Sequence, residues 1–491
     1  MRKRIIVLFL SMAILATLCS CKSRSDIIDD VASFFDTTSQ NDELEFSDKS
    51  EEPYTVSSDT KIPSGSSSAS DIINSQEGGT DESENKPTVS IGNEVKVEET
   101  VVKGGEIKEP ENTGTVETIT FNNKHNAVLE EDYFQYNTLN EKEKELYKRI
   151  VETINSSNNI VDVSNLSVYS DDVTYAFQKV LADYPQFFYI SRSCLLVYNL
   201  KGKTVKALVL SYTDGTVTDQ FDKQMNLTQK ADRQVINSKI SQLKSAVENV
   251  VSKISSETAD VIKEKIIHDH IAKTVEYDHD SAANIDSYGA VIPHAFDLYG
   301  AAVEKLAVCE GYSKWFQYLC YNVGINATQV FGTANGGNHM WNSVLIEDDW
   351  YFVDLTWNDA NNMVIYSHFN LTFTQITKHH TVDSSVVAIP SCTSGKNSFA
   401  NKFAICVADL KEEPTDFEEK IENIKLSGDK RIFIIFEDYD KAYKNTEKYT
   451  DYIQRYFLWF KSKFNLYLLD QGMELSQKIS LCEDYFIIEA K

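Results

Sequence analysis

The sequence predicts an α+β protein, because helix-like and strand-like patterns both recur along the chain. Apolar residues repeat at the 3.6-residue spacing of a helix over Leu139–Ile154 and Asp171–Tyr184. Two β-like runs follow, Phe187–Leu200 and Thr204–Tyr212, with a Lys-Gly turn signal between them. Further along, a helical segment leads into two strand-like runs separated by a tight acidic turn.

Length and composition exclude several classes of protein. The 491 residues are enough for several domains with a large buried core, which excludes a peptide hormone or a knottin. Asp and Glu number 74 against 48 Lys and Arg, and the net charge of −26 would repel a nucleic acid. The eight cysteines show no CxxC spacing, so neither a zinc ribbon nor a disulfide scaffold is predicted.

The first 20 residues have the pattern of a lipoprotein signal peptide. A basic start, Arg2-Lys3-Arg4, precedes an apolar run that is too short for an ordinary membrane span. The run ends in Leu-Cys-Ser-Cys, which resembles the lipobox of bacterial lipoproteins and implies that residues 1–20 are removed and Cys21 carries lipid. An ordinary cleaved signal or an uncleaved anchor is the alternative. We expect the chain to be lipid-anchored on the extracytoplasmic face of a bacterial membrane.

Residues 21–128 are predicted to be a disordered acidic linker. Between Lys22 and Glu130 there are 24 acidic and 9 basic residues, and the serine-rich and glycine-rich stretches have almost nothing to bury. A flexible chain of this length has a root-mean-square span of about 55–60 Å. It is either a spacer that holds the folded part away from the membrane or low-complexity filler.

Residues 129–256 are predicted to form a helix-rich α+β region. It contains the two helices and the two strands named above, and Asp171 and Asp172 stand where an N-cap is wanted. A long polar helix over Thr228–Ser252 completes the region. Another helix, Glu257–Val275, begins the next one.

Residues 391–491 are predicted to form a small accessory α/β domain. Strands are expected over Lys402–Val407, Arg431–Phe436, Asn465–Leu469 and Asp484–Ile488, and helices over Asp416–Ile424 and Tyr439–Phe460. The sequence shows no catalytic constellation there. We interpret the aromatic residues of the second helix as a stripe that faces the core.

The segment that carries chemistry lies between Leu298 and Asp359. Apolar residues at helical spacing predict a helix that begins at Cys309 and is stopped by Gly324. A thiol at a helix start lies beside the positive end of the helix dipole and unpaired backbone N–H groups, which favour a thiolate. The same N–H groups are suited to hold an oxyanion.

Two strand-like runs after this helix carry the other reactive groups. They are HMWNSVLIE and WYFVDLTWND, and the acidic turn between them predicts a hairpin. His339 then lies at the start of one strand and Asp354 towards the end of the other. A cysteine nucleophile needs an imidazole to take its proton and a carboxylate or amide to orient that imidazole, and Cys309, His339 and Asp354 supply these groups.

Three segments closely resemble the core motifs of transglutaminase-like domains: AVCEGYSKWFQYL, HMWNSV and WYFVDLTWND. The upstream segment IIHDHIAKTVEYD resembles the leader of bacterial extracellular members. The resemblance is strong over about Glu257–Asp359 and implies a transglutaminase-like domain at residues 257–390 with a papain-like fold. Glu304-Lys305-Leu306 departs from the family pattern, because many relatives have a glycine-containing turn there.

The resemblance also implies roles and a reaction. Cys309 would be the nucleophile, His339 the general base and acid, and Asp354 the orienting group. The family acts on protein or peptide amides through a Cys thioester, by transamidation, deamidation or peptide hydrolysis, and the motifs do not choose among these. No cofactor is implied.

Three aromatic residues are candidates for contact with a substrate. Tyr299 is a candidate second oxyanion donor, and the alternative is a tyrosine that only packs. Trp341 and Trp357, together with Trp350, are expected to pack around the triad or to wall an acyl-group tunnel, with plain core packing as the alternative.

No metal site is predicted. His268 and His270 point about 200° apart on a helix, so they cannot share one ion. His379-His380 has no carboxylate at a useful spacing and is expected in an exposed loop. Cys320 is interpreted as a small core thiol, and the other cysteines, Cys194, Cys392, Cys406 and Cys482, either pair or stay buried.

The sequence therefore predicts a membrane-anchored, extracytoplasmic cysteine enzyme. Its partners would be a protein or peptide of the cell envelope or exterior and, through the lipid, the membrane. Two alternatives belong to other classes. One is a non-catalytic module of the same fold that binds peptide or cell-wall polymer, and the other is a structural envelope protein whose C-terminal domain docks a partner.

Overall fold

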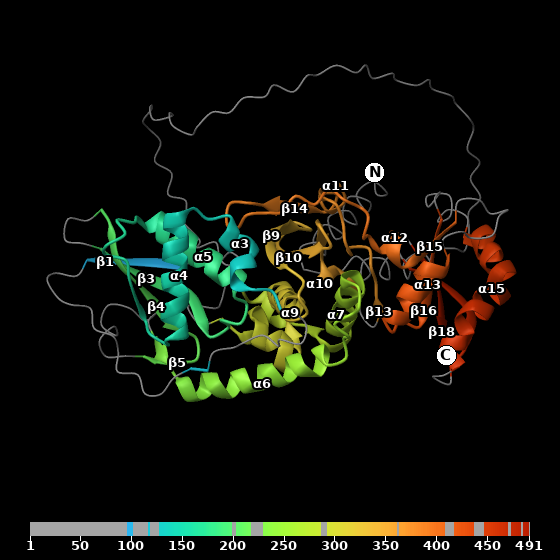
Figure 1. Cartoon of the computed structure of the whole chain (residues 1–491), viewed down its shortest axis with the longest axis horizontal. Helices are drawn as coiled ribbons and strands as arrows, with labels where there is room; N and C mark the ends of the chain where they lie inside the picture. The colour runs from blue at the N-terminus through green and yellow to red at the C-terminus, as the bar shows by residue number, and fades with distance from the viewer. Residues whose placement is uncertain are drawn as a thin grey trace, which may run out of the picture. The chain divides into compact units, whose positions relative to one another are not determined.

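Figure 1 shows the computed structural model, in which helices and strands both recur and confirm the α+β class. The structure describes residues 96–101, 116–117, 127–198, 203–217, 229–285, 292–360, 363–407, 417–436, 446–469, 473–482 and 485–490. The predicted signal peptide, Cys21 and most of the predicted linker lie outside these residues. Among the helices that the structure describes, none has both the length and the apolar character that a membrane span requires.

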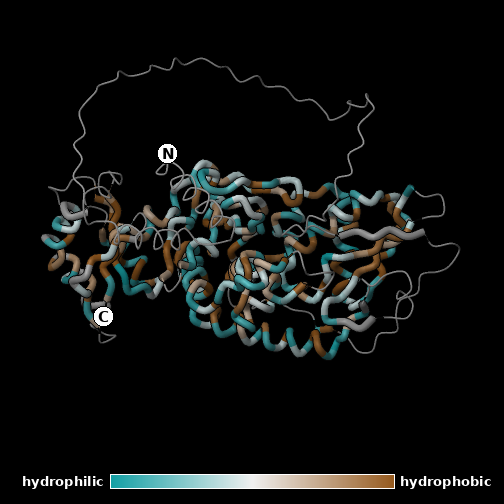
Figure 2. Tube along the Cα trace, turned by 180° about the vertical axis from the view of Figure 1, so that it is seen from behind, coloured by the Kyte–Doolittle hydropathy of each residue, from teal (hydrophilic) through white to brown (hydrophobic). Residues whose placement is uncertain are grey.

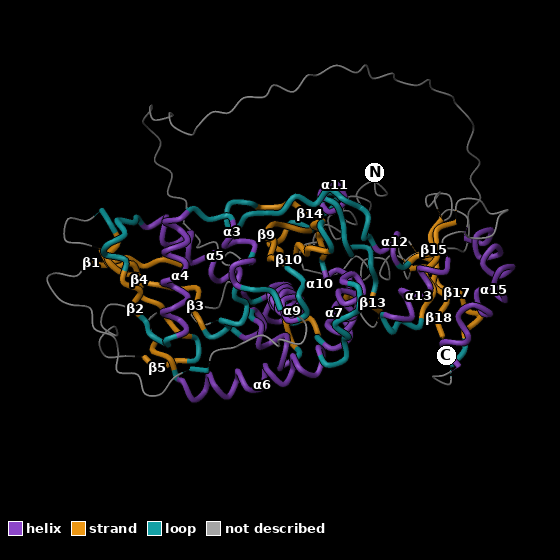
Figure 3. The backbone as a smooth tube through the Cα atoms, viewed as in Figure 1, coloured by secondary structure: helices purple, strands orange, loops and turns teal. Residues whose placement is uncertain are grey.

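Three four-stranded sheets organise the described part of the chain, and Figure 3 shows their strands as three separate groups. The first has the order β1-β3-β4-β2, with β1 at Lys96–Val101, β2 at Ile160–Asp162, β3 at Ile190–Tyr198 and β4 at Val205–Tyr212. The predicted hairpin of β3 and β4 is confirmed by their antiparallel pairing. Strand β1 pairs with β3 in parallel, so this part of the predicted linker is not disordered but extends a sheet.

Helices α4, at Glu141–Asn155, and α5, at Ser170–Asp183, pack beside this sheet (Figure 1). The Asn140 side chain accepts a hydrogen bond from the third residue of α4 and so caps the helix. The predicted capping role of Asp171 and Asp172 needs a correction. The N-cap of α5 is Tyr169, and Asp172 contributes from inside the first turn by accepting a hydrogen bond from the Tyr169 amide at 2.9 Å.

Two long helices follow, α6 at Arg233–Val251 and α7 at Asp260–Thr274. The residues of α6 alternate between hydrophilic and hydrophobic along its length (Figure 2), because only one face of this helix is buried. In contrast, α7 is buried on most sides, although it carries several charged residues. Those charges must therefore be paired within the protein.

The second sheet has the order β11-β10-β9-β14 and is antiparallel throughout. Its strands are β9 at Ala327–Ala334, β10 at Gly337–Ile346, β11 at Asp349–Val353 and β14 at His380–Asp383. The predicted hairpin around the acidic turn is confirmed, since Ile346 pairs with Asp349. This sheet packs on helix α9, Cys309–Asn322, where the Asn342 side chain donates to the Ser313 carbonyl at 3.1 Å.

Helix α9 begins at Cys309 and is stopped by Gly324, as predicted. Gly324 has φ +84°, and the Ile325 amide donates back to the Cys320 carbonyl at 2.9 Å, which closes a Schellman motif. The helix is more buried than its single apolar face predicts. All its residues except Lys314 are buried, so its polar groups have to find their partners inside the protein.

Shorter elements connect these units. The short helices are η2 at Glu130–Asp132, α3 at Phe134–Asn137, α8 at His279–Ala283, η4 at His294–Phe296, η5 at Gly300–Glu304, α10 at Leu355–Asn358, α11 at Phe373–Ile376 and α12 at Phe399–Lys402. The short strands are β5 at Gly215–Val217, β6 at Gln229–Ala231, β7 at Glu276–Tyr277, β8 at Leu306–Ala307, β12 at Asp359–Ala360 and β13 at Met363–Val364. Parallel pairing of β7 with β8 ties the end of α7 to the start of α9.

The third sheet has the order β15-β16-β18-β17. Its strands are β15 at Ala404–Val407, β16 at Arg431–Phe436, β17 at Leu475–Cys482 and β18 at Tyr485–Ala490, and its helices are α13 at Phe417–Leu426 and α15 at Thr446–Leu469. The alternation of strands and helices follows the prediction. However, α15 continues through residues 465–469, where we expected a strand, and β17 was not predicted.

A buried ionic network connects α7 to the first residues of β16. Lys265 donates to Asp269 and Asp429 at 2.8 Å each, and Arg431 donates to Asp429 at 2.9 Å. The Tyr366 hydroxyl lies within 3.0 Å of both carboxylates. Burial opposes ionisation, but Lys265 and Arg431 outweigh it and hold the pKa of Asp429 well below its ordinary value. Two cations and two anions thus neutralise one another between α7 and the third sheet.

Candidate active site

Cys309 is the first residue of α9, with Val308 as the N-cap. The first backbone N–H groups of a helix have no partner inside the helix, so this end presents donors beside the thiol. Gly311 allows the preceding chain to approach, because a Cβ there would lie 2.7 Å from the Ala295 carbonyl oxygen. The Glu304-Lys305-Leu306 departure is accommodated locally, since Lys305 itself takes the left-handed conformation, with φ +60°.

His339 and Asp354 lie close together just beyond the last paired residues of the β10–β11 hairpin. Asn342 pairs with Val353, which places Asp354 directly beyond the paired residues and His339 three positions along the other strand. His339 Nε2 lies 2.7 Å from Asp354 Oδ2. Asp354 Oδ1 also accepts the Trp357 amide at 3.1 Å, so the carboxylate caps α10 as well. The predicted pair is therefore in contact.

In this pair, each residue favours the charged form of the other. Burial alone would raise the pKa of Asp354, but the charge and hydrogen bond of His339, and those of His380, hold it well below its ordinary value. Burial alone would lower the pKa of His339, yet the Asp354 charge and hydrogen bond, with a hydrogen bond to Cys309, hold it well above its ordinary value. An ionised carboxylate only accepts hydrogen bonds, so His339 donates from Nε2 and its Nδ1 is left for Cys309.

His380 is a fourth member of this site that the sequence did not reveal. Its Nε2 lies 2.9 Å from the same Asp354 oxygen that His339 contacts, and its side chain is buried. The prediction of an exposed loop for His379-His380 is correct for the exposure of His379 and wrong for His380. His380 begins β14, a strand separated from Asp354 by 26 residues, and no local pattern announces that pairing.

The aromatic candidates have different environments. Trp341 and Trp357 lie beside the site, with ring centroids 5.8 and 6.1 Å from that of His339. Trp350 packs on Phe134 instead, at 5.0 Å. The Tyr299 hydroxyl donates to Gln242 of α6 at 3.0 Å, and its ring stacks on Phe188. Tyr299 is thus engaged as a packing residue, and its candidate role as an oxyanion donor is not supported by these contacts.

The chain around Val387 and Ala388, which we call the strap, helps to bury the Cys309 thiol. Cys309 is only 2% exposed and packs against Ala182, Phe331, Met340 and Val387. The neighbouring Ala388 is held through both its backbone groups, because its N–H donates to the Gln135 side chain and its carbonyl accepts from it, each at 2.9 Å. A substrate can therefore reach the Cys309 sulfur only if some of the residues that cover it move.

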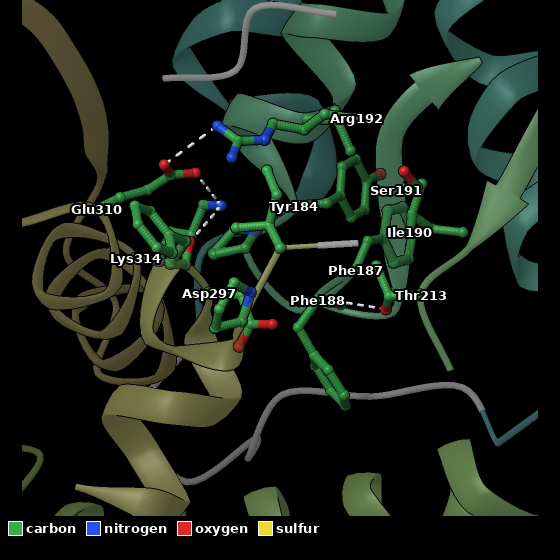
Figure 4. A pocket seen from close by; sticks show the side chains of 15 residues that line it. Tyr184, Phe187, Phe188, Ile190, Ser191, Arg192, Thr213, Asp297, Glu310 and Lys314 are labelled. Atoms are coloured by element: carbon green, nitrogen blue, oxygen red, sulfur yellow. Dashed lines mark hydrogen bonds and ion pairs between the residues drawn. The ribbon is translucent and has the colours of Figure 1, made fainter. Parts of the chain in front are cut away.

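A small cavity of about 50 Å³ lies near the next residue of α9 (Figure 4). In it, the fully buried Glu310 accepts from Arg192 at 3.2 Å and from Lys314 at 2.7 Å. Tyr184, Phe187 and Phe188 contribute aromatic side chains to the lining. The cavity is too small for a peptide. We therefore assign its ion pairs, which bind Glu310, a role in holding the start of α9 in place.

The buried group of His339, Asp354 and His380 is arranged for hydrogen bonding among its members. Within the described residues, His339, Asp354 and His380 are the group whose ligand atoms lie close enough together for a metal ion, within 4.8 Å. Both imidazoles donate to the carboxylate, and the described residues offer no hydrogen-bond partner to His380 Nδ1. Metal-binding histidines usually have their second nitrogen held by a partner. Elsewhere, His268 is held by Asp269 and Asn358, as befits a core histidine.

Comparison with known proteins identifies the central part of the chain. The model of the transglutaminase-like superfamily matches residues 246–355, which include Cys309, His339 and Asp354. The chain contains a transglutaminase-like domain. This confirms the family resemblance of the three motifs and the core that it implied.

Two solved structures show distant similarity to the chain. A structure described as a TGase has 18% identity and a TM-score of 0.23, over 36% of this chain and 47% of that one. A candidate cysteine protease from Cytophaga hutchinsonii has 17% identity and a TM-score of 0.20, over 40% of this chain and 58% of that one. The chain thus spans about half the length of these structures, and we draw no inference from them. Among curated proteins, no match is found.

Proposed function

We propose that the protein is a cysteine enzyme whose transglutaminase-like domain transfers acyl groups from protein or peptide amides through a thioester on Cys309. One observation carries the proposal. The buried Asp354 accepts a hydrogen bond from His339 at 2.7 Å, while the remaining nitrogen of His339 serves a cysteine at the first position of a helix. Nucleophile, base and orienting carboxylate are then all present at one site, with the base and the carboxylate in direct contact.

The first half of the reaction forms the thioester. The Cys309 sulfur attacks the amide carbon, and the electron pair of the carbonyl moves to its oxygen, which the N–H groups at the start of α9 stabilise. The C–N bond then breaks as His339 donates its proton to the leaving nitrogen. The raised pKa of His339 suits this step, because the imidazole arrives protonated.

The second half resolves the thioester. An amine or a water molecule attacks the acyl carbon, His339 takes the proton, and the C–S bond breaks to restore the thiolate. An amine gives transamidation, and water gives deamidation or, if the first bond broken was in a peptide chain, hydrolysis. Trp341 and Trp357 flank the imidazole and would limit the access of water to it.

The full chain, kept in detergent, can be tested with a glutamine-containing peptide in the presence and absence of a primary amine. We expect ammonia release, together with a mass change of the peptide that shows whether the amine or water was used. Peptide binding with neither ammonia release nor an acyl adduct on Cys309 would instead favour the non-catalytic alternative. The closed strap over Cys309 is the observation that favours that alternative.

We also propose that Cys21 is acylated and anchors the protein on the extracytoplasmic face of a bacterial membrane, where its substrates would be envelope or external proteins. The sequence pattern of residues 1–21 supports this placement. Metabolic labelling with a fatty-acid analogue is expected to mark the wild-type chain and not Cys21→Ser. Equal labelling of both chains would contradict the assignment.

A further inference from the structure

We propose that His380 is a positioning residue of this site. It fixes the Asp354 carboxylate in place, and it hydrogen-bonds to the same carboxylate oxygen as His339. The inference rests on the proposed function, because it concerns how His339 gains and loses its proton. It also adds a residue that lies outside the three sequence motifs and beyond the segment matched to the family, residues 246–355.

The carboxylate is held by three donors. Oδ2 accepts from His339 at 2.7 Å and from His380 at 2.9 Å, and Oδ1 accepts from the Trp357 amide at 3.1 Å. Asp354 and His380 are both fully buried at their side chains. A buried anion needs such donors, and with three of them in different directions it cannot rotate without breaking one.

The sheet brings His380 to this point. On strand β9, Gly332 pairs with His339 on one side and with Val382 on the other, and Ala334 pairs with His380. Residues two apart on a strand share a face, so both imidazoles lie on the same face across β9. Gly332 allows β14 and the Trp341 ring to approach β9 closely, because a Cβ there would collide with the Thr381 carbonyl oxygen and lie 2.8 Å from the Trp341 ring.

The His380 ring has mostly aromatic surroundings and makes one hydrogen bond to a described residue, Asp354. Its ring packs against Trp357 at 4.6 Å and Trp341 at 4.9 Å. Within the described residues its Nδ1 finds no hydrogen-bond partner, so the bond to Asp354 is the hydrogen bond that orients the ring between these two indoles.

Sharing the carboxylate has a chemical consequence. The titratable groups around it are His339, Cys309 and His380, with His368 and His379 near His380. Burial is the main reason that the pKa of His368 falls to about 3, so it stays neutral. If the His380 donor is lost, more of the Asp354 charge acts on His339, which then holds its proton more strongly. Such an imidazolium gives its proton to a leaving amine more slowly.

The test compares two matched variants of the full chain, His380→Gln and His380→Asn. The glutamine amide nitrogen can take the place of Nε2, whereas the asparagine amide is too short to reach Asp354. We expect His380→Asn to lower kcat for amide turnover about 10- to 100-fold with little change in KM. Losses of this size are typical when a residue that orients a metal-binding side chain is removed, and His380 orients Asp354 in a similar way. We expect the acid limb of Cys309 alkylation to move to lower pH, and His380→Gln to retain wild-type behaviour in both assays.

Two results would overturn the inference. One is wild-type turnover and alkylation in His380→Asn, and the other is an equal loss in both variants that follows a fall in thermal stability, which would mark His380 as structural. The alkylation profile needs no substrate. It therefore tests His380 even if the wild-type chain transfers no acyl group, which is the result that would count against the proposed function itself.

Discussion

Replacement of Cys309 by alanine is expected to abolish amide turnover, with a loss of at least about a thousandfold in kcat. No other group at the start of α9 can form the thioester, because the covalent bond to the acyl group needs the sulfur. The fold should be unaffected, since the change removes one atom from a side chain packed in a small apolar cluster. Turnover and the thermal unfolding temperature should be measured on the same preparation.

Cys320→Ala is the matched control. It removes a second buried thiol from the same helix, and burial, with the nearby Glu264 charge, raises the pKa of Cys320 well above its ordinary value. That thiol stays protonated and cannot serve as a nucleophile. We expect Cys320→Ala to keep most of its turnover, while a Cys309→Ala protein with wild-type turnover would rule out the thioester.

Asp429→Ala is expected to lower the free energy of unfolding by about 3–5 kcal/mol, because it leaves the buried cations Lys265 and Arg431 with Asp269 as their one remaining anion in the network. Asp429 accepts hydrogen bonds from Lys265 at 2.8 Å and from Arg431 at 2.9 Å, and all three side chains are largely buried. Its folded-state pKa is lowered, so its contribution is present at neutral pH and is lost as the pH falls through that lowered value. Denaturant unfolding at pH 7 measures the loss.

An exposed ion pair provides the comparison. Glu347 pairs with Lys396 where both side chains are at least half exposed. Solvent screens such pairs, so Glu347→Ala is expected to change the free energy of unfolding by less than about 1 kcal/mol. If Asp429→Ala cost no more than this control, the network would not be holding α7 against the third sheet.

Local patterns in the sequence were sufficient for the centre of the site. The spacing of apolar residues located the start of α9 at Cys309, and the acidic turn between two β-like runs located the hairpin that brings His339 to Asp354. These features depend on residues close together in the chain. The family resemblance added the roles.

Features that depend on distant pairing were not predictable. His380 reaches Asp354 because β14 pairs with β9, and nothing near His380 in the sequence specifies that partner. Strand β1 lies within an acidic segment but pairs with β3. The apolar residues at 465–469 suit a strand or a helix equally, and continuation of α15 decides the outcome.

The most direct test of the account is the rate of Cys309 alkylation by iodoacetamide, followed by peptide mass between pH 5 and 9 in the wild type and in His339→Ala. A working Cys309–His339 pair predicts that at pH 6 the wild-type thiol reacts at least about 10-fold faster than the variant, while Cys320 in the same digest stays unmodified. Equal rates at Cys309 in the two proteins, or no reaction at Cys309 in either, would contradict the account.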